Sequence, residues 1–377
     1  MRARSEPTPL ALILAKQIQS QGPITFAEFM EACLYHPEFG YYTKPEQPAR
    51  RDYFTSVDAS PIFGRLLGRQ FHEMWTLLGR PNPFVLAEAG AGTGALAKQI
   101  LDFAAESLPE FYAALEFAAV ERSAARREMQ SKLLGAHIAR GKFTASSELP
   151  SEITDGCIFS NELMDAFPVN RVVREGGELR EIYVGLGKDG LCGQNGTPST
   201  PALGAYFAEE QVTLQDEQQA EVNLAACEWI MEAAQKLRQG FVLSIDYGHE
   251  ASELYDERHM RGTLLAYERH RASEDFFRAP GEQDLTAHVN FTALDRCGRR
   301  GGLARTGLTS QSNFLLALAR HSDFADLQSD GMSEAEQTRA RLLFKTLIHP
   351  EGMGETFQVL IQHKGIEEPH LAGFEPL

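Results

Sequence analysis

The chain has 377 residues, of which 43% are hydrophobic and 23% are charged. These proportions are those of an ordinary globular protein, and they exclude a collagen-like, low-complexity or wholly disordered chain. Aspartate and glutamate outnumber lysine and arginine by 52 to 36, which gives a formal net charge of −16. Such a surface repels phosphate groups, so we predict that the protein binds neither nucleic acid nor a membrane. A cationic substrate would be attracted, although the charge alone selects none.

The N-terminal segment combines two arginines with a short apolar run at residues 10–15. The run is shorter than a secretory signal core, and no small-residue cleavage site follows it. Ile13, Leu14 and Ile18 would lie on one face of a helix. We therefore predict a first helix here, with a short organellar presequence as the alternative. No stretch approaches the roughly 18 apolar residues that a membrane span needs.

The cysteines are odd in number and widely scattered, at positions 33, 157, 192, 227 and 297. This spacing resembles neither a disulfide framework nor a CxxC pair. Buried, reduced thiols are typical of a reducing compartment, so we predict a cytoplasmic location. The histidines show no paired spacing for a metal, and we predict no metal site.

Strand and helix signals alternate through the middle of the chain, which predicts an α/β fold with a parallel sheet. Strands are predicted at 84–88, 116–120, near 137–144, 156–160 and 241–245, and helices at 95–105, 124–134 and about 217–238. A Glu-Gly-Gly-Glu turn at 175–178 separates two β-rich runs and indicates an inserted antiparallel hairpin. Residues 248–290 show few periodic runs, and such long irregular stretches are often functional. The chain closes with helices near 311–320 and 333–348 and a strand at 356–362.

The strongest local motif is the turn Glu88-Ala-Gly90-Ala-Gly92-Thr-Gly94, between the first predicted strand and its helix. Glycines allow a tight turn and a close ligand approach, and the helix N-terminus presents unpaired amides. The spacing also fits a dinucleotide fingerprint. However, Glu88 would repel a pyrophosphate and suits a ligand with an ammonium and a sulfonium group. Glu121, which ends the next strand, could accept hydrogen bonds from ribose hydroxyls. Both features favour S-adenosylmethionine over NAD; a ligand-free tight turn is the alternative.

Further polar residues follow the later strands at the same sheet edge. Asn161 is interpreted as a helix cap, which puts Glu162 and Asp165 on adjacent parts of one helical face. These carboxylates would either line the transferable methyl group or serve only as first-turn acids. Asp246 and His249 follow the strand at 241–245, as a turn or as candidate proton acceptors.

Several separated blocks resemble the MidA-type proteins, a family that includes the mitochondrial complex I assembly methyltransferase. The blocks are Tyr35–Tyr42, Asp52–Ser56, Pro61–Gly64, Glu88–Gly94, Val120–Ser123, Asn161–Val169, Ile245–Gly248, Gly262–Leu264, Ala279–Gly281, Asp284–Val289 and Met353–Glu355. Many methyltransferases share the glycine motif, but the ordered set, which runs from Gly22 to about Lys364, is specific. Two positions depart from the family pattern, Arg51 and Asn170.

The resemblance implies the class I S-adenosylmethionine methyltransferase fold. This is a Rossmann-like, doubly wound sheet of seven strands with one reversed hairpin strand, an N-terminal helical lid and an inserted hairpin and helical subdomain. The predicted division is residues 1–80 for the lid, 81–170 and 240–377 for the cofactor-binding core, and 171–239 for the insert.

The resemblance also implies an enzyme that methylates an accessible arginine of a protein substrate, by symmetric dimethylation of a respiratory-complex subunit or another protein subunit. Carried over by position, the cofactor would be held by Glu88, Gly90, Gly92, Gly94, Glu121, Arg122, Asn161, Thr55 and Ser56, and the candidate catalytic residues are Asn161, Glu162, Asp165, Asp246 and His249. A non-catalytic assembly scaffold and a small-molecule methyltransferase are the alternatives. The oligomeric state is left open, with a homodimer as one option.

Overall fold

The computed structural model describes residues 6–44, 61–268, 271–327, 333–349 and 354–376. The chain forms two compact units, each assembled from segments that are distant in sequence. Unit 1 takes its residues from Met1–Tyr53, Met164–Glu228 and His249–Leu294, and unit 2 from Phe54–Leu163, Trp229–Gly248 and Asp295–Leu377. The division into lid, core and insert is a different partition of the chain and stays a prediction.

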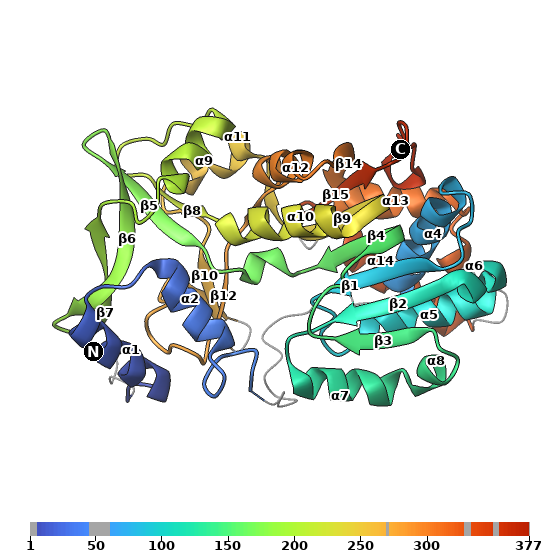
Figure 1. The fold of residues 1–377 in the computed structure, drawn as a ribbon, viewed down its shortest axis with the longest axis horizontal. Coiled ribbons are helices and arrows are strands. Elements are labelled where there is room, and N and C mark those ends of the chain that lie inside the picture. The colour runs from blue at the N-terminus through green and yellow to red at the C-terminus, as the bar shows by residue number, and fades with distance from the viewer. Residues whose placement is uncertain (1–5, 45–60, 269–270, 328–332, 350–353, 377) are drawn as a thin grey trace. The chain divides into compact units, whose positions relative to one another are not determined.

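Unit 2 is built on the main sheet, in which seven strands follow one another in the order β14-β15-β9-β4-β1-β2-β3 (Figure 1), and an eighth, the short β13, pairs with β9 beside this path. The strands are β1 (Phe84–Ala89), β2 (Leu115–Val120), β3 (Phe143–Ser146), β4 (Ile153–Asn161), β9 (Leu237–His249), β14 (Ala304–Ser310) and β15 (Phe357–Lys364). The pairs that join β9, β4, β1, β2 and β3 are parallel, whereas β15 runs antiparallel to both of its neighbours. The predicted α/β fold with one reversed strand is confirmed.

The strand order reverses direction next to β1. The chain leaves β1 through α5 (Ala95–Ser107) and α6 (Pro109–Ala114) to β2, then passes α7 (Ala124–Leu133) and α8 (Gly135–Ala139) to β3, but β4 returns to the opposite side of β1. Ligands of open α/β sheets bind at such a switch point, beyond the carboxyl ends of the strands. The glycine-rich turn follows β1 at this point.

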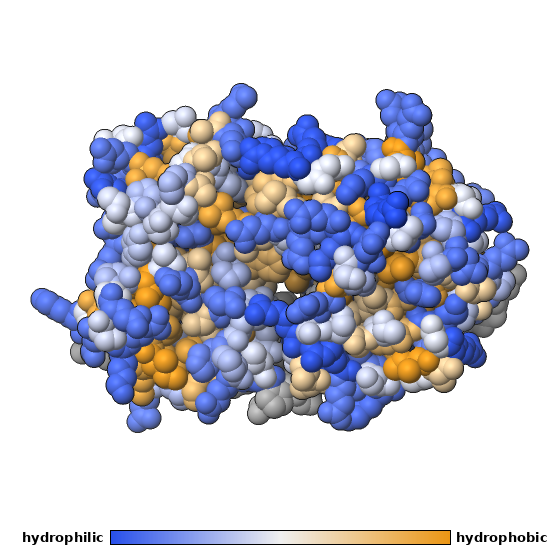
Figure 2. All heavy atoms as spheres, viewed as in Figure 1, coloured by the Kyte–Doolittle hydropathy of each residue, from blue (hydrophilic) through white to orange (hydrophobic). Residues whose placement is uncertain are grey.

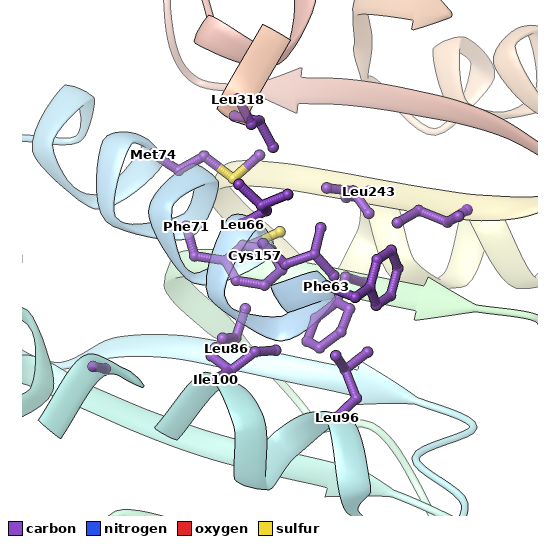
Figure 3. Close-up of a cluster of buried hydrophobic side chains, with 14 of the residues drawn as sticks. Phe63, Leu66, Phe71, Met74, Leu86, Leu96, Ile100, Cys157, Leu243 and Leu318 are labelled. Carbon is purple, nitrogen blue, oxygen red and sulfur yellow. The ribbon is translucent and has the colours of Figure 1, made fainter. Parts of the chain in front are cut away.

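The helix α4 (Pro61–Leu77) contributes much of the apolar core of unit 2. Figure 3 shows Phe63, Leu66, Phe71 and Met74 of α4 gathered with Leu86, Cys157 and Leu243 of the sheet, Leu96 and Ile100 of α5, and Leu318 of α13 (Gln311–His321). The rings of Phe71 and Phe159 are 4.9 Å apart between centroids. One helix therefore packs against three adjacent strands, β1, β4 and β9. This packing holds in place the carboxyl ends of the strands, where the candidate polar residues lie.

Unit 1 has two antiparallel sheets. One has the order β7-β6-β5-β8 and the other β11-β10-β12. The strands are β5 (Asn170–Glu175), β6 (Glu178–Gly187), β7 (Gly190–Gly196), β8 (Gln219–Val222), β10 (Leu265–Glu268), β11 (Arg271–Ser273) and β12 (Asp284–Thr286), and β13 (Val289–Asn290) follows. The turn at Gly176 and Gly177, both with positive φ, joins β5 to β6, which confirms the predicted hairpin.

The remaining helices and 3-10 turns complete the two units. Unit 1 contains α1 (Pro9–Gln21), α2 (Phe26–Tyr35), α9 (Ala202–Glu210), α11 (Ala251–Leu254) and the 3-10 turns η2 (Met164–Ala166) and η3 (Glu257–His259). Unit 2 contains α14 (Glu334–Ile348), η4 (Ala325–Leu327) and η6 (Ala372–Phe374), and the residues of α10 (Leu224–Lys236) and α12 (Phe291–Arg300) are divided between the units. The predicted first helix is confirmed as α1, with Leu10, Leu14 and Ile18 buried, but Ile13, which was expected on the same face, is 40% exposed.

Three predicted elements differ from the structure. Residues 135–139 form α8, so the strand predicted near 137–144 begins only at Phe143. Residues 219–222, predicted as helix, pair with β5, and α10 begins at Leu224. Residues 248–290 contain short strands rather than an irregular stretch. Strands of two to four residues carry too little periodicity to be recognised, because pairing with distant residues stabilises them.

Hydrophilic side chains cover most of the face in Figure 2, and hydrophobic patches between them are small. Among the bulky apolar residues that the structure describes, the largest exposed fractions are 61% for Leu342 and 57% for Leu12. In the part of the chain that the structure describes, no helix is both long enough and apolar enough to cross a bilayer.

We expect Phe71→Ala to destabilise unit 2 by about 3–5 kcal/mol, because it removes a fully buried ring and leaves a cavity. Leu77→Ala on the same helix, at a side chain 45% exposed, is the matched control and should cost less than about 1 kcal/mol. The effects of both substitutions are measured by denaturant unfolding, with loss of cofactor binding as the signal that unit 2 has unfolded. Equal effects of the two substitutions would contradict the packing described for α4.

Candidate cofactor and catalytic site

Three glycines with positive φ shape the turn between β1 and α5. The φ angles are 72° at Gly90, 51° at Gly92 and 83° at Gly94, a region that residues with a Cβ rarely adopt. The amides of Gly90 and Ala91 both donate to the carbonyl of Val120, at 2.9 and 3.1 Å. The turn is therefore fastened to the end of β2, next to Glu121.

Only one of these glycines leaves space above the backbone. A Cβ at Gly90 would lie 2.8 Å from Leu163 Cδ1, and one at Gly94 would lie 3.0 Å from Gln130 Cγ. A Cβ at Gly92 would meet nothing closer than the carbonyl of Gly90, at 3.9 Å. Gly90 and Gly94 thus serve internal packing, whereas the open side of Gly92 lets a ligand approach the backbone. Sequence reasoning missed Gln130, a fully buried residue whose Nε2 supports the turn by donating to the carbonyl of Gly92 at 2.7 Å.

Glu121 is oriented by the backbone of this turn. Its Oε2 accepts the Gly92 amide at 3.0 Å, its Oε1 accepts the Ser123 amide at 2.8 Å, and Arg126 Nη1 is 3.8 Å away. Each carboxylate oxygen has two acceptor directions, so both oxygens can accept a further hydrogen bond. The arrangement fits the two ribose hydroxyls of a nucleoside. Arg122 follows directly, and its carbonyl accepts a hydrogen bond from Arg127 at 2.9 Å.

Glu88 is the most unusual acid of unit 2. Its side chain on β1 is 4% exposed, and Oε2 has no hydrogen-bond partner within the described residues. Burial and the nearby charge of Glu121 raise the pKa of Glu88 to about 8. A buried carboxyl without a partner is unfavourable. A ligand with an ammonium group would remove this cost, which is the fit expected of the amino-acid end of S-adenosylmethionine.

The residues after β4 form a turn, not the predicted helix. Asn161 is the last residue of β4, Glu162 has a φ of 53°, and only Met164–Ala166 forms a single 3-10 turn. Asn161 therefore caps no helix, and the expected helical spacing of Glu162 and Asp165 is wrong. The cause is the neighbouring strand β9, because the Glu162 amide donates to the carbonyl of Ile245 at 3.0 Å and continues the sheet pairing.

Asp246 fixes this turn. It is fully buried, Oδ2 accepts the Leu163 amide at 3.1 Å, and Oδ1 accepts the Tyr247 amide at 3.0 Å. A non-glycine residue in the left-handed region costs about 1–3 kcal/mol, and such strain is concentrated at functional sites. The half-buried Glu162 is held in that conformation at the carboxyl end of β4, and its Oε1 accepts Asn161 Nδ2 at 3.2 Å.

The remaining predicted site residues lie outside the glycine turn and the turn after β4. Asp165 and His249 belong to unit 1, where His249 Nδ1 is 3.2 Å from Glu253. Burial raises the pKa of Asp165 to about 7. Asn170, one of the two departures from the family pattern, is buried and donates to Glu181 at 2.8 Å. Thr55, Ser56 and Arg51 lie outside the described residues.

Comparisons with known proteins identify the family. Residues 66–309 match the family described as "Putative S-adenosyl-L-methionine-dependent methyltransferase". The chain belongs to this family. It is an S-adenosylmethionine-dependent methyltransferase, and S-adenosylmethionine is its cofactor, as Glu88, Glu121 and the glycine turn predicted.

A crystal structure from Burkholderia thailandensis that holds S-adenosyl-homocysteine is 29% identical, with a TM-score of 0.87, and the match covers 99% of this chain and 98% of that one. Among curated proteins, the human protein arginine methyltransferase NDUFAF7, mitochondrial, is 27% identical over 97% of this chain and 86% of its own length. The rat protein of that name is 28% identical over 95% and 85%.

These relatives correct the predicted location. They are named as mitochondrial proteins, which contradicts the cytoplasmic location predicted from the sequence. The prediction rested on free cysteines, and reduced thiols persist in any compartment that lacks oxidising conditions. All five cysteines are free in the structure, but this observation does not distinguish one reducing compartment from another.

We expect the affinity for S-adenosyl-homocysteine to rise with pH between about 6 and 8, by up to tenfold per unit, and to level off above that range. Glu88, with a pKa of about 8, must lose its proton before it pairs with the ligand's ammonium group. Glu88→Gln should flatten the profile and weaken binding at about pH 8. Calorimetry measures both effects.

The control for this titration is Glu116→Gln, which changes an exposed carboxylate on β2. Its profile should follow that of the unsubstituted protein. A pH-independent affinity in the unsubstituted protein would contradict the role given to Glu88.

Proposed function

We propose that the protein transfers a methyl group from S-adenosylmethionine to a guanidinium nitrogen of an arginine in a protein substrate. Support comes from the relatives, which are named protein arginine methyltransferases. The structural observation that carries the proposal is the strained Glu162, held at the carboxyl end of β4 by the backbone bonds of its turn. A carboxylate fixed at this edge suits a cationic acceptor.

The chemistry is an in-line displacement. The bond from sulfur to the methyl carbon breaks as the bond from carbon to nitrogen forms, S-adenosyl-homocysteine leaves, and the nitrogen loses a proton. Alignment of the reacting atoms supplies much of the rate enhancement. The guanidinium lone pairs are delocalised, and its pKa lies above about 12. A carboxylate that binds two of its N–H groups orients the third nitrogen and offsets the positive charge.

We assign this orienting role to Glu162. Asp246 has both carboxylate oxygens bound to backbone amides, so its role is to position the turn. Asn161 Nδ2 fixes one oxygen of Glu162, and its own Oδ1 is buried without a hydrogen-bond partner in the described structure. Two further roles remain predictions: that Asp165 is a second carboxylate that binds the guanidinium group, and that His249 accepts the proton.

The resemblance to the MidA-type family extends the proposal to symmetric dimethylation of a respiratory-complex subunit. The test is incubation with methyl-labelled S-adenosylmethionine and a mitochondrial lysate, followed by mapping of the labelled residue and acid hydrolysis. The proposal expects label in a protein, recovered as symmetric dimethylarginine. Label confined to small molecules, or to a side chain other than arginine, would contradict it.

We expect Glu162→Gln to lower turnover by about 10²–10³-fold, because it removes the charge that orients the acceptor, and to leave cofactor affinity within about twofold. Single-turnover transfer of labelled methyl and calorimetry with S-adenosyl-homocysteine measure the two quantities. Glu152→Gln, at a side chain 59% exposed, is the matched control and should retain full turnover. Retained turnover in Glu162→Gln would refute the assignment.

A further inference from the structure

We propose that unit 1 carries a binding site for a guanidinium cation, formed by Asp165, Asp284, Tyr35, Tyr42 and Tyr267. The identification of that cation as an arginine side chain of the substrate, separate from the methyl acceptor that Glu162 orients, rests on the proposed function. The cation chemistry itself rests on the interactions within unit 1. Four of these residues have had no role so far.

Asp165 is a buried acid with an unused acceptor. It lies in η2 with 6% of its surface exposed, and its Oδ1 accepts no hydrogen bond within the described residues. The amides of Asp165 and Ala166 offset only part of the effect of burial, which is why its pKa remains high. A buried carboxyl in this state is costly unless a cation or donor reaches it.

Asp284 supplies a second carboxylate in the same cluster. It is fully buried on β12, and its Oδ2 accepts the hydroxyl of Tyr42 at 2.7 Å. The Ala287 amide donates to the carbonyl of Asp165 at 3.0 Å, so η2 is fastened to the residues that follow β12. Burial, and then the charges of Asp284 and Asp165, raise the pKa of Tyr42 well above its usual value. Both carboxylates therefore lie close enough to the hydroxyl of Tyr42 to raise its pKa.

Tyrosine rings border the two carboxylates. Tyr35 and Tyr42 stack with centroids 5.7 Å apart and an angle of 28°, and the Tyr35 hydroxyl donates to the carbonyl of Ala166 at 3.0 Å. Tyr267 lies directly opposite Asp284 in the β10–β12 pair, and burial and the charge of Asp165 raise its pKa. All three rings are half-buried, so the cluster reaches the surface.

The combination selects a flat cation. Two carboxylates can accept several N–H groups in one plane, and aromatic faces stack on a guanidinium better than on a compact ammonium. The residues also come from segments far apart in the sequence, with Tyr42 and Asp284 separated by 242 positions. This assembly of acids and aromatic rings is the chemistry that recognises an arginine side chain.

The test is titration of the full-length protein, saturated with S-adenosyl-homocysteine, with N-acetylarginine amide. N-acetylcitrulline amide has nearly the same shape but no charge, and it should bind at least tenfold more weakly. Asp284→Asn should weaken binding of the arginine probe by about 10–100-fold. Tyr267→Leu, which does not alter a buried charge, should weaken it by about 3–30-fold.

The controls are Glu282→Gln, a partly exposed carboxylate two residues from Asp284, and Tyr41→Phe, which should leave binding of the arginine probe unchanged. Unchanged unfolding midpoints and unchanged affinity for S-adenosyl-homocysteine establish that the variants are folded. If Asp284→Asn does not fold, Tyr267→Leu decides.

Absence of binding, equal binding of the arginine and citrulline probes, or unaltered binding by the folded variants would overturn the site. These outcomes are separable from the proposed function. Arginine methylation with an unchanged KM in Asp284→Asn would exclude this site and leave the methyl acceptor in place. Loss of arginine-specific binding in the variants would support the site even if the label in the lysate experiment were found on another side chain.

Discussion

The constraint on which the cofactor site depends is the burial of two acids at one sheet edge. Glu88 is the penultimate residue of β1 and Glu121 directly follows the neighbouring strand β2, and neither is more than 8% exposed. The backbone of the glycine turn satisfies Glu121, so the cost of the second charge falls on Glu88, which keeps its proton near neutral pH. A cationic ligand reverses this balance, because its ammonium group makes the ionised form of Glu88 favourable. If Glu88 and Glu121 hold the cofactor as we propose, the site selects charge as well as shape.

The same sheet edge also imposes the strained turn after β4. Asp246 on β9 holds the amide of Leu163, and the side chain of Leu163 fills the space that a Cβ at Gly90 would need. The glycine turn and the turn that carries Glu162 are thus packed against one another within unit 2. A change in either turn would disturb both cofactor binding and the orientation of Glu162.

The strands and turns that depend on neighbouring residues in the sequence could be predicted from the sequence alone. The buried strands β1, β2 and β4 and the glycine turn were identified, and Glu121 was placed directly after β2, since apolar runs, glycine clusters and an acid after a strand are recognisable without the fold. The conformation of Glu162 was not, because it is set by hydrogen bonds to β9, more than 80 positions away. The contacts of Gln130, and those of Tyr35, Tyr42 and Tyr267 in unit 1, were not predicted for the same reason: their partners are distant in sequence, and no periodicity marks them.

In the proposed reaction, both the methyl donor and the arginine acceptor are cations. The sulfonium donor and the guanidinium acceptor repel each other, and this repulsion increases when water is excluded. Buried carboxylates offset it only if no lysine or arginine of the protein already neutralises them. Glu88 in unit 2 and Asp165 in unit 1 each retain a buried oxygen without a hydrogen-bond partner in the described structure, and burial raises the pKa of both. Because acids of this kind would destabilise a protein without ligands, we infer that each unit, taken by itself, binds a cation: the ammonium group of the cofactor at Glu88 and a guanidinium group at Asp165.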